Sequence, residues 1–279
     1  MKVTKNVSKG TVLFDTVLID DDFNLGKIID SGQCFRPCRT EDGAYRFVTG
    51  DHIITIRDVT ERPGDTPTRL GVSCSLEEWD RVWHPYFDLD TNYREIRNSI
   101  PEKDRYLQKA AKAGAGIRIL RQDKFETLIS FIISQRKSIP AIRTSIDRLV
   151  NLYGHEDFFP KPSDMLGATD EELKSCGLGY RVPYIRQAVE RVAYRDVDLD
   201  ALDELPDDEL VSELKSFAGV GDKVANCVAL FAYHRTGRAP VDTWIARVIA
   251  GQYKGENPFP RYGEYAGIMQ QYMFYSEIH

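Results

Sequence analysis

Two residues in the last third of the chain could do chemistry together, an amine and a thiol. Lys223 stands four positions ahead of Cys227, so both side chains lie on one face of a helix, where each can influence the other's ionisation. An amine held at a pocket is a competent nucleophile and forms Schiff bases with sugar aldehydes. Taken alone, the pair would more often be a surface lysine beside a small buried cysteine.

A glycine-rich turn precedes this lysine. We expect a helix, a tight Gly-x-Gly turn at Gly219 and Gly221, and a second helix, together spanning 210–230. The glycines let the backbone approach a phosphodiester closely, and the free N–H groups that open the second helix attract its charge. Such a turn grips a nucleic-acid backbone without reading its bases. Taken alone, it also fits an ordinary corner between helices.

A carboxylate follows in the segment Ala239-Pro240-Val241-Asp242-Thr243. The proline and a short extended step lead into Asp242, which we expect to cap a helix beginning near Thr243. Capping alone would account for an aspartate here. Beside a sugar, however, the same carboxylate would stabilise the oxocarbenium-like charge that develops when a glycosidic bond breaks.

The elements that position these groups fall into two parts. Before about residue 95 the pattern favours strands, at 11–19 and in a β-hairpin of 45–50 and 52–59 about the turn TGDH. From about Leu76 onward apolar residues increasingly recur at helical spacing. The clearest helical segments are 125–134, 142–154, 184–194 and 208–217. The sequence therefore predicts an α+β fold, with a small N-terminal antiparallel β-sheet domain over 1–95 packed on an all-helical domain over 96–279.

Composition excludes several classes of protein. A hydrophobic content of 42% and a charged content of 29% over 279 residues are typical of soluble globular proteins. No apolar run approaches the roughly 18 residues that a membrane span needs. The five cysteines suit free thiols in a reducing compartment, and they lack the paired spacing of zinc sites. We therefore expect a cytoplasmic protein, associated with the nucleoid if bacterial, that is a monomer without a cofactor or a metal held by side chains.

The net charge of −6 opposes nucleic-acid binding on the whole, because Lys and Arg drive phosphate binding. The acidic residues, however, concentrate in 196–213, whereas basic residues cluster in two other stretches. These are Arg118, Arg121, Lys124, Arg136, Lys137, Arg143 and Arg148, and then Lys174, Arg181, Arg186, Arg191 and Arg195. Charge alone favours two solvated helix faces.

Taken together, the turn, the lysine and the aspartate resemble the helix-hairpin-helix DNA glycosylase superfamily. Further blocks resemble its 8-oxoguanine DNA glycosylase/AP lyase family, and they occur in the family's order over nearly the whole chain. These blocks are SGQCFRP at 31–37, ILRQDKFETLISFI at 119–132, CGLGYR at 176–181, GVGDKVANC at 219–227, PVDTW at 240–244 and YAGIMQQYMF at 265–274.

The resemblance implies a bifunctional enzyme that flips 8-oxoguanine out of duplex DNA and excises it. Lys223 would attack C1′ of the sugar, Asp242 would support departure of the base, and β-elimination through the Schiff base would nick the strand. The carbonyl of Gly32 would accept a hydrogen bond from N7–H, a donor that 8-oxoguanine has and guanine lacks.

It also implies how the base and the DNA are held. Cys227 and Phe274 would sandwich the flipped base, Gln270 would read its pairing edge, and Pro240 would form part of the pocket floor. The implied DNA contacts are Arg136 as a plug for the vacated space, Tyr180 and Arg181 beside the estranged base, and Gly219, Gly221 and Val224 at the hairpin. A monovalent cation is implied on the carbonyls of Lys215, Phe217 and Val220.

Three places depart from the eukaryotic members. Gln135-Arg136-Lys137-Ser138 replaces their Asn-rich turn. Ala141 matches the arginine that reads cytosine opposite the lesion, so we expect weaker preference for cytosine. Trp244 stands where those members have a histidine on the phosphate side, and the sequence assigns it no role.

Three other functions compete with this interpretation. A monofunctional alkylpurine glycosylase would share the hairpin and the aspartate but use water in place of Lys223. An iron–sulfur relative of endonuclease III would need a four-cysteine cluster after Asp242, which the sequence lacks. A non-catalytic DNA-binding module would give no purpose to Gly32 and Phe274.

Overall fold

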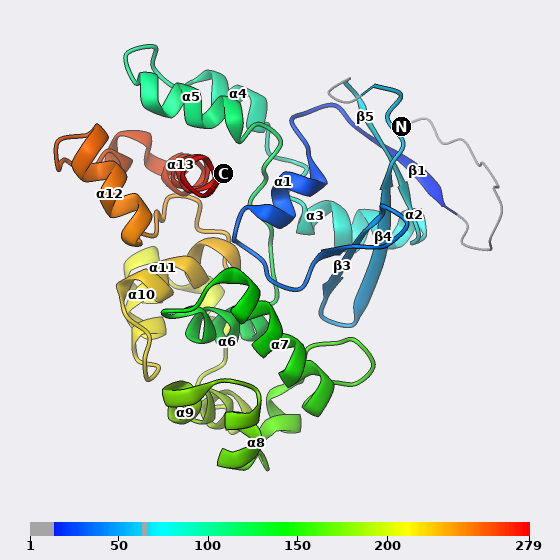
Figure 1. The fold of residues 1–279 in the computed structure, drawn as a ribbon, viewed down its shortest axis with the longest axis vertical. Coiled ribbons are helices and arrows are strands. Elements are labelled where there is room, and N and C mark those ends of the chain that lie inside the picture. The colour runs from blue at the N-terminus through cyan, green and yellow to red at the C-terminus, as the bar shows by residue number, and fades with distance from the viewer. Residues whose placement is uncertain (1–13, 63–65) are drawn as a thin grey trace.

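The computed structural model describes residues 14–62 and 66–279, and Figure 1 shows a twisted sheet beside an array of helices. All neighbouring strands of the sheet are antiparallel, in the order β1-β5-β4-β3-β2. The strands are β1 (Asp15–Ile19), β2 (Cys38–Arg39), β3 (Tyr45–Thr49), β4 (His52–Asp58) and β5 (Thr68–Val72). The predicted first strand is confirmed over 15–19, while its residues 11–13 lie outside the described part.

The predicted hairpin is confirmed in β3 and β4. Thr49 pairs with His52 across a two-residue turn in which Gly50 has a φ of +51°, a conformation that glycine adopts without strain. Alternation along the two strands places Phe47 and Ile54 directly opposite each other on the buried face. One face of the sheet is therefore apolar and needs a cover.

Short helical elements supply that cover, and those over residues 79–86 carry large aromatic side chains. They are α1 (Leu25–Asp30), α2 (Leu76–Glu78), a π-helical turn (Trp79–Trp83) and α3 (His84–Tyr86). The ring of Phe47 meets that of Phe87 edge-on, with centroids 5.0 Å apart, an arrangement that aromatic pairs favour. Trp83 and Phe87 are fully buried in the same cluster.

The remaining helices share a second core around α6. They are α4 (Tyr93–Asn98), α5 (Arg105–Ala113), α6 (Lys124–Ser134), α7 (Ile139–Tyr153), α8 (Asp170–Ser175), α9 (Val182–Ala193), α10 (Asp207–Lys215), α11 (Asp222–Phe231), α12 (Thr243–Gln252) and α13 (Ala266–Ile278). The four predicted helical segments are confirmed as α6, α7, α9 and α10. Almost every side of α6 is buried because it packs against α7, α9 and α11.

The α+β fold class is confirmed. Each of the two cores contains a residue from the part of the chain that mainly builds the other core. Leu120 packs in the core beneath the sheet, whereas Phe35 packs in the helical core. Between them, the buried guanidinium of Arg118 pairs with Asp21 at 3.0 Å and donates to the carbonyl of Phe87 at 3.0 Å. The domain boundary at residue 95 stays a prediction. Within the described residues, no helix is long and apolar enough to cross a membrane.

Candidate active site

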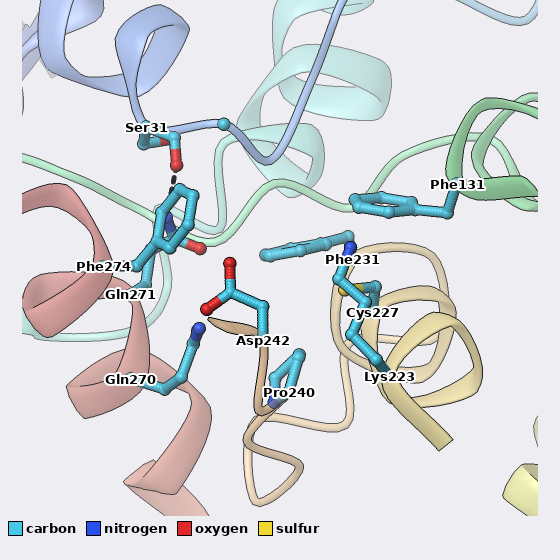
Figure 2. A pocket seen from close by; sticks show the side chains of 11 residues that line it. Ser31, Phe131, Lys223, Cys227, Phe231, Pro240, Asp242, Gln270, Gln271 and Phe274 are labelled. Carbon is cyan, nitrogen blue, oxygen red and sulfur yellow. Dashed lines mark hydrogen bonds between the residues drawn. The ribbon is translucent and has the colours of Figure 1, made fainter. Parts of the chain in front are cut away.

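A cavity opens between α11, α13 and the loop after α1. Figure 2 shows the side chains around it. It is lined by Ser31, Gly32, Phe131, Lys223, Cys227, Phe231, Pro240, Asp242, Gln270, Gln271 and Phe274. Both predicted catalytic residues and all five predicted base contacts therefore meet in one place, although they come from segments up to 242 positions apart.

Lys223 lies in the first turn of α11, as predicted, and its side chain is half-buried. Its Nζ lies 5.1 Å from the centre of the Phe131 ring, over the ring face. One turn later, Cys227 is buried. Burial raises the pKa of the Cys227 thiol, and the nearby charge of Lys223 opposes this shift only in part. The thiol is therefore a neutral wall of the cavity at physiological pH, one helical turn from the amine of Lys223.

Asp242 caps α12, as the sequence predicted. One carboxylate oxygen, Oδ1, accepts a hydrogen bond from the backbone N–H of Ile245 at 2.9 Å, and this bond fixes the side chain. Figure 2 shows the carboxylate projecting into the cavity between Lys223 and Gln270. Capping thus leaves the carboxylate available in the cavity, because the bond that caps the first turn of α12 also orients it.

The backbone at Gly32 is held by a buried polar network. Gln271 donates from Nε2 to the carbonyl of Ser31 at 2.5 Å, a bond drawn in Figure 2. Gln33 donates from Nε2 to the hydroxyl of Ser31 at 2.9 Å and to the carbonyl of Arg118 at 2.9 Å. These bonds flank Gly32 on both sides, and its own carbonyl accepts no backbone hydrogen bond within the described residues.

The side-chain space at Gly32 is also taken. Its φ is +76°, and a Cβ there would lie 2.8 Å from Cε1 of Phe274. Both the left-handed backbone and the close aromatic ring require glycine. Phe274 in turn stands at the wall of the cavity opposite Cys227.

Gln270 offers an unused acceptor. The residue is only 5% exposed, and its Oε1 has no hydrogen-bond partner within the described residues. Buried polar atoms are nearly always paired, and leaving one unpaired is costly. Gln270 therefore keeps an acceptor for a hydrogen-bond donor, and the residue lines the cavity.

The predicted helix-hairpin-helix is formed by α10, the turn and α11. Gly219 has a φ of +78°, and a side chain there would overlap with the ring of Tyr184. Gly221, in contrast, has an ordinary φ of −97° and lies exposed at the start of α11 with open space around it. The carbonyl of Phe217 accepts from Val220 N–H at 3.1 Å, and the cation site on the hairpin carbonyls stays a prediction.

A wider groove runs past the mouth of the cavity. The turn between α6 and α7 lines it with Arg136, which has a φ of +52° and an exposed side chain. The starts of α11 and α12 line it with Gly221, Val224 and Trp244. Val224 is buried, whereas Trp244 is 40% exposed. The predicted plug and the predicted hairpin therefore meet in one groove.

Tyr180 and Arg181 take different positions from each other. Tyr180 is 52% exposed, but Arg181 is only 5% exposed. The guanidinium of Arg181 donates to the carbonyls of Leu178 and Gln135, and lies 4.3 Å from the centre of the Tyr180 ring. In this conformation Arg181 supports the tyrosine and the turn at Gln135, and its place beside the estranged base stays a prediction.

Four lining residues were not singled out from the sequence. Ser31, Phe131 and Gln271 stand inside blocks that carry the resemblance, so their positions were the available signal. Phe231 had none, since an apolar residue in an amphipathic helix indicates only a core position. Among residues 14–62 and 66–279, no three His, Cys, Asp or Glu side chains gather where they could hold a metal ion.

Comparison with known families agrees with this geometry. Residues 16–128 match the N-terminal domain of 8-oxoguanine DNA glycosylase. Residues 129–262 match the HhH-GPD superfamily of base excision DNA repair proteins. The two matches meet within α6.

Similar proteins cover nearly all of the chain. The N-glycosylase/DNA lyase OGG1 of Arabidopsis thaliana is 28% identical, over 95% of this chain and 80% of its own length. The structure of MBOgg1 in complex with a low-affinity DNA ligand is 34% identical, with a TM-score of 0.87 over 100% of this chain and 99% of that one. The 8-oxoguanine glycosylase/lyase of Clostridium acetobutylicum, in complex with dsDNA containing cytosine opposite 8-oxoG, is 31% identical, with a TM-score of 0.86 over 99% and 97%. The chain belongs to the 8-oxoguanine DNA glycosylase family of the HhH-GPD superfamily.

Proposed function

We propose that this protein excises 8-oxoguanine from duplex DNA and then cleaves the strand, as an N-glycosylase and DNA lyase of base excision repair. The observation that carries this function is the meeting of Lys223 and Asp242 in one cavity whose other walls suit a flat, polar ring. A glycosidic bond needs a carboxylate beside the sugar, and a lyase needs an amine.

Discrimination of the damaged base falls to the Gly32 carbonyl. With the flipped base between Cys227 and Phe274, this oxygen accepts the N7–H of 8-oxoguanine. Guanine has a lone pair at N7, so the carbonyl would face another acceptor and remain unpaired. The free Oε1 of Gln270 accepts from the N–H groups of the pairing edge.

The chemistry proceeds through a covalent intermediate. The nitrogen of Lys223 forms a bond to C1′ as the bond from C1′ to N9 breaks, and the base leaves with the bonding electrons. The carboxylate of Asp242 stabilises the positive charge on the sugar. Opening of the sugar ring gives a Schiff base. Loss of a proton from C2′ then expels the 3′ phosphate, which nicks the strand.

Borohydride trapping on a duplex containing 8-oxoguanine tests this assignment. The wild-type enzyme should form a covalent adduct, and Lys223→Gln should form none. Lys112→Gln, which alters an exposed lysine on α5, is the matched control and should trap normally. Release of alkylated bases without any adduct would establish the monofunctional alkylpurine glycosylase instead.

The role of Asp242 is tested separately. Asp242→Asn should keep the cap on α12, because an asparagine side chain accepts the same hydrogen bond, but the charge beside the sugar is lost. We expect single-turnover excision to slow by about 10²–10³-fold. Unchanged excision by a folded Asp242→Asn enzyme would remove the carboxylate from the mechanism.

A further inference from the structure

A second glycine turn, at residues 177–179, lies between α8 and α9, as the turn at 219–221 lies between α10 and α11, although a 3-10 turn at Gly179–Arg181 separates it from α9. In each turn the first glycine is left-handed, with a φ of +76° at Gly177 and +78° at Gly219, and has side chains packed close against it. In each turn the second glycine is exposed, and a Cβ there would meet nothing within 4 Å. The second turn therefore also leaves its main chain open to close approach.

Two cationic side chains converge on this second turn. Lys137 donates from Nζ to the carbonyl of Gly177 at 2.7 Å and to the hydroxyl of Ser145 at 2.5 Å. Arg148, on α7, donates from Nη1 to the carbonyl of Ser175 at 3.3 Å and is otherwise exposed. Most N–H donors of Arg148 are therefore still free to bind a ligand.

No carboxylate neutralises these charges. Within the described residues, no Asp or Glu oxygen lies within 4.0 Å of a side-chain nitrogen of Lys137, Arg148 or Arg181, whereas Lys124 and Arg186 both pair with aspartates. Burial lowers the pKa of Lys137, and the charges of Arg181 and Arg148 lower it further. The cluster is thus a local excess of positive charge on an acidic protein.

Through Lys137, the second turn is also connected to the wider groove that runs past the mouth of the cavity. Lys137 lines that groove from the turn between α6 and α7, while Gly221 lines it from the start of α11. Tyr180 follows the second turn directly, and its ring meets that of Tyr184 edge-on at 6.2 Å. Tyr184 packs in turn against Gly219. A row of two tyrosines therefore joins one glycine turn to the other.

We propose that the turn at 177–179, with Arg148 and Lys137, binds a phosphodiester of the strand opposite the damaged base. This proposal rests on the proposed function. The hairpin at 219–221 adjoins Lys223 and so takes the strand whose sugar reacts. Because the exposed Tyr180 stands between the two turns, a phosphate at the second turn belongs to the other strand.

The salt dependence of DNA binding tests the proposal. We would measure Kd on a duplex with an uncleavable tetrahydrofuran abasic site, over a range of salt concentrations. Loss of one phosphate contact makes the negative slope of log association constant against log salt concentration shallower by about 0.9. This corresponds to about fivefold weaker binding at ~0.15 M salt. Arg148→Gln should show both effects, and Arg148→Lys should keep the wild-type slope.

A matched control lies at the other end of the molecule. Arg105→Gln alters an exposed arginine at the start of α5, far from α8 and α9 in Figure 1, and should leave slope and affinity unchanged. If Arg148→Gln also keeps the wild-type slope, the second phosphate site is wrong.

Methylphosphonate substitution, one phosphate at a time, identifies the strand. Wild-type enzyme should lose affinity at one position of the undamaged strand, and Arg148→Gln should lose nothing further there. If the phosphate whose replacement affects wild type but not Arg148→Gln lies on the damaged strand, the proposal is wrong. Failure of the wild-type enzyme to bind any duplex would count instead against the proposed function.

Discussion

The atom that we assign to damage recognition belongs to a residue without a side chain. At Gly32, both the φ of +76° and the ring of Phe274 leave no room for a Cβ. Gly43 has a similar φ of +79° but nothing within 4 Å of the Cβ position. The two glycines therefore separate the cost of a left-handed backbone from the cost of crowding the cavity.

This contrast gives a prediction. Gly43→Ala should lower the free energy of unfolding by about 1 kcal/mol, the cost of placing alanine in a left-handed conformation, and should excise 8-oxoguanine normally. Gly32→Ala should cost more and lose excision, because Phe274 must move. Urea unfolding and single-turnover excision measure both quantities. If the two variants have the same free energy of unfolding and the same excision rate, the ring of Phe274 moves aside at no cost and the prediction is wrong.

A second residue bears on the predicted preference for the base opposite the lesion. Ala141 is exposed near the start of α7 and carries no group that could read a base. Excision opposite cytosine should therefore exceed excision opposite the other three bases only modestly, and Ala141→Arg should increase that ratio, since arginine can donate to a base edge. Rates on four duplexes that differ only in the opposing base test this. A strong cytosine preference in the wild-type enzyme would refute it.

At the scale of elements, the two glycines of the helix-hairpin-helix turn at 219–221 have different surroundings. Gly219 is packed against Tyr184, and Gly221 faces open space with an ordinary φ. Gly221→Ala should therefore leave thermal stability unchanged but weaken binding to duplex DNA, because the new methyl group stands between the backbone and a phosphate. Gly219→Ala should instead lower thermal stability, because its Cβ would overlap with the ring of Tyr184. Thermal unfolding and Kd on the same duplex distinguish them, and unaltered DNA binding by Gly221→Ala would contradict the close approach.

Most elements could be predicted from the sequence because their signals are local. The alternation in β3 and β4, the helical spacing in α6 and α9, and the cap at Asp242 all arise within a few residues. The packing of these elements is not local. The network of Gln33 and Gln271 joins residues 238 positions apart, and no short pattern reports it.

Arg181 illustrates the same limit. Its sequence position next to Tyr180 predicts a DNA contact, which stays a prediction, but gives no sign of the backbone carbonyls that its buried guanidinium meets. An arginine satisfies carbonyls and phosphates with the same donors. Only the three-dimensional arrangement decides which of them it meets.

At the scale of the molecule, one buried aspartate joins three distant parts of the chain. Asp88 follows α3 and accepts from the hydroxyl of Tyr93 at 2.9 Å and from Arg121 at 3.0 Å. Nε2 of His234, just after α11, lies 3.2 Å from the same carboxylate. Burial alone would raise the pKa of Asp88, but His234, then Tyr93 and Arg121, outweigh burial and hold the pKa well below its ordinary value.

The sign of the pH dependence follows. A carboxylate with a lowered pKa in the folded state contributes stability above its unfolded pKa of about 3.9, and this contribution is lost as pH falls towards the folded value. Asp88→Asn should lower the free energy of unfolding by about 3 kcal/mol at neutral pH. The difference from wild type should shrink below about pH 4. Denaturant unfolding at several pH values measures it.

The control for this prediction is close by. Asp90 has a side chain that is 89% exposed, so Asp90→Asn should change stability by only a few tenths of a kcal/mol at any pH. A pH-independent loss in Asp88→Asn would assign the effect to packing in place of charge.

The glutamine network around Gly32 has a consequence for how such an enzyme could acquire a new substrate. Every amino acid carries a main-chain oxygen, so no codon change at position 32 deletes the acceptor itself. What mutation can alter is the direction of this carbonyl, through Gln33 and Gln271, which donate to the hydroxyl and to the carbonyl of Ser31. Evolution towards a different lesion would therefore begin at these supporting amides, which hold the residue before Gly32.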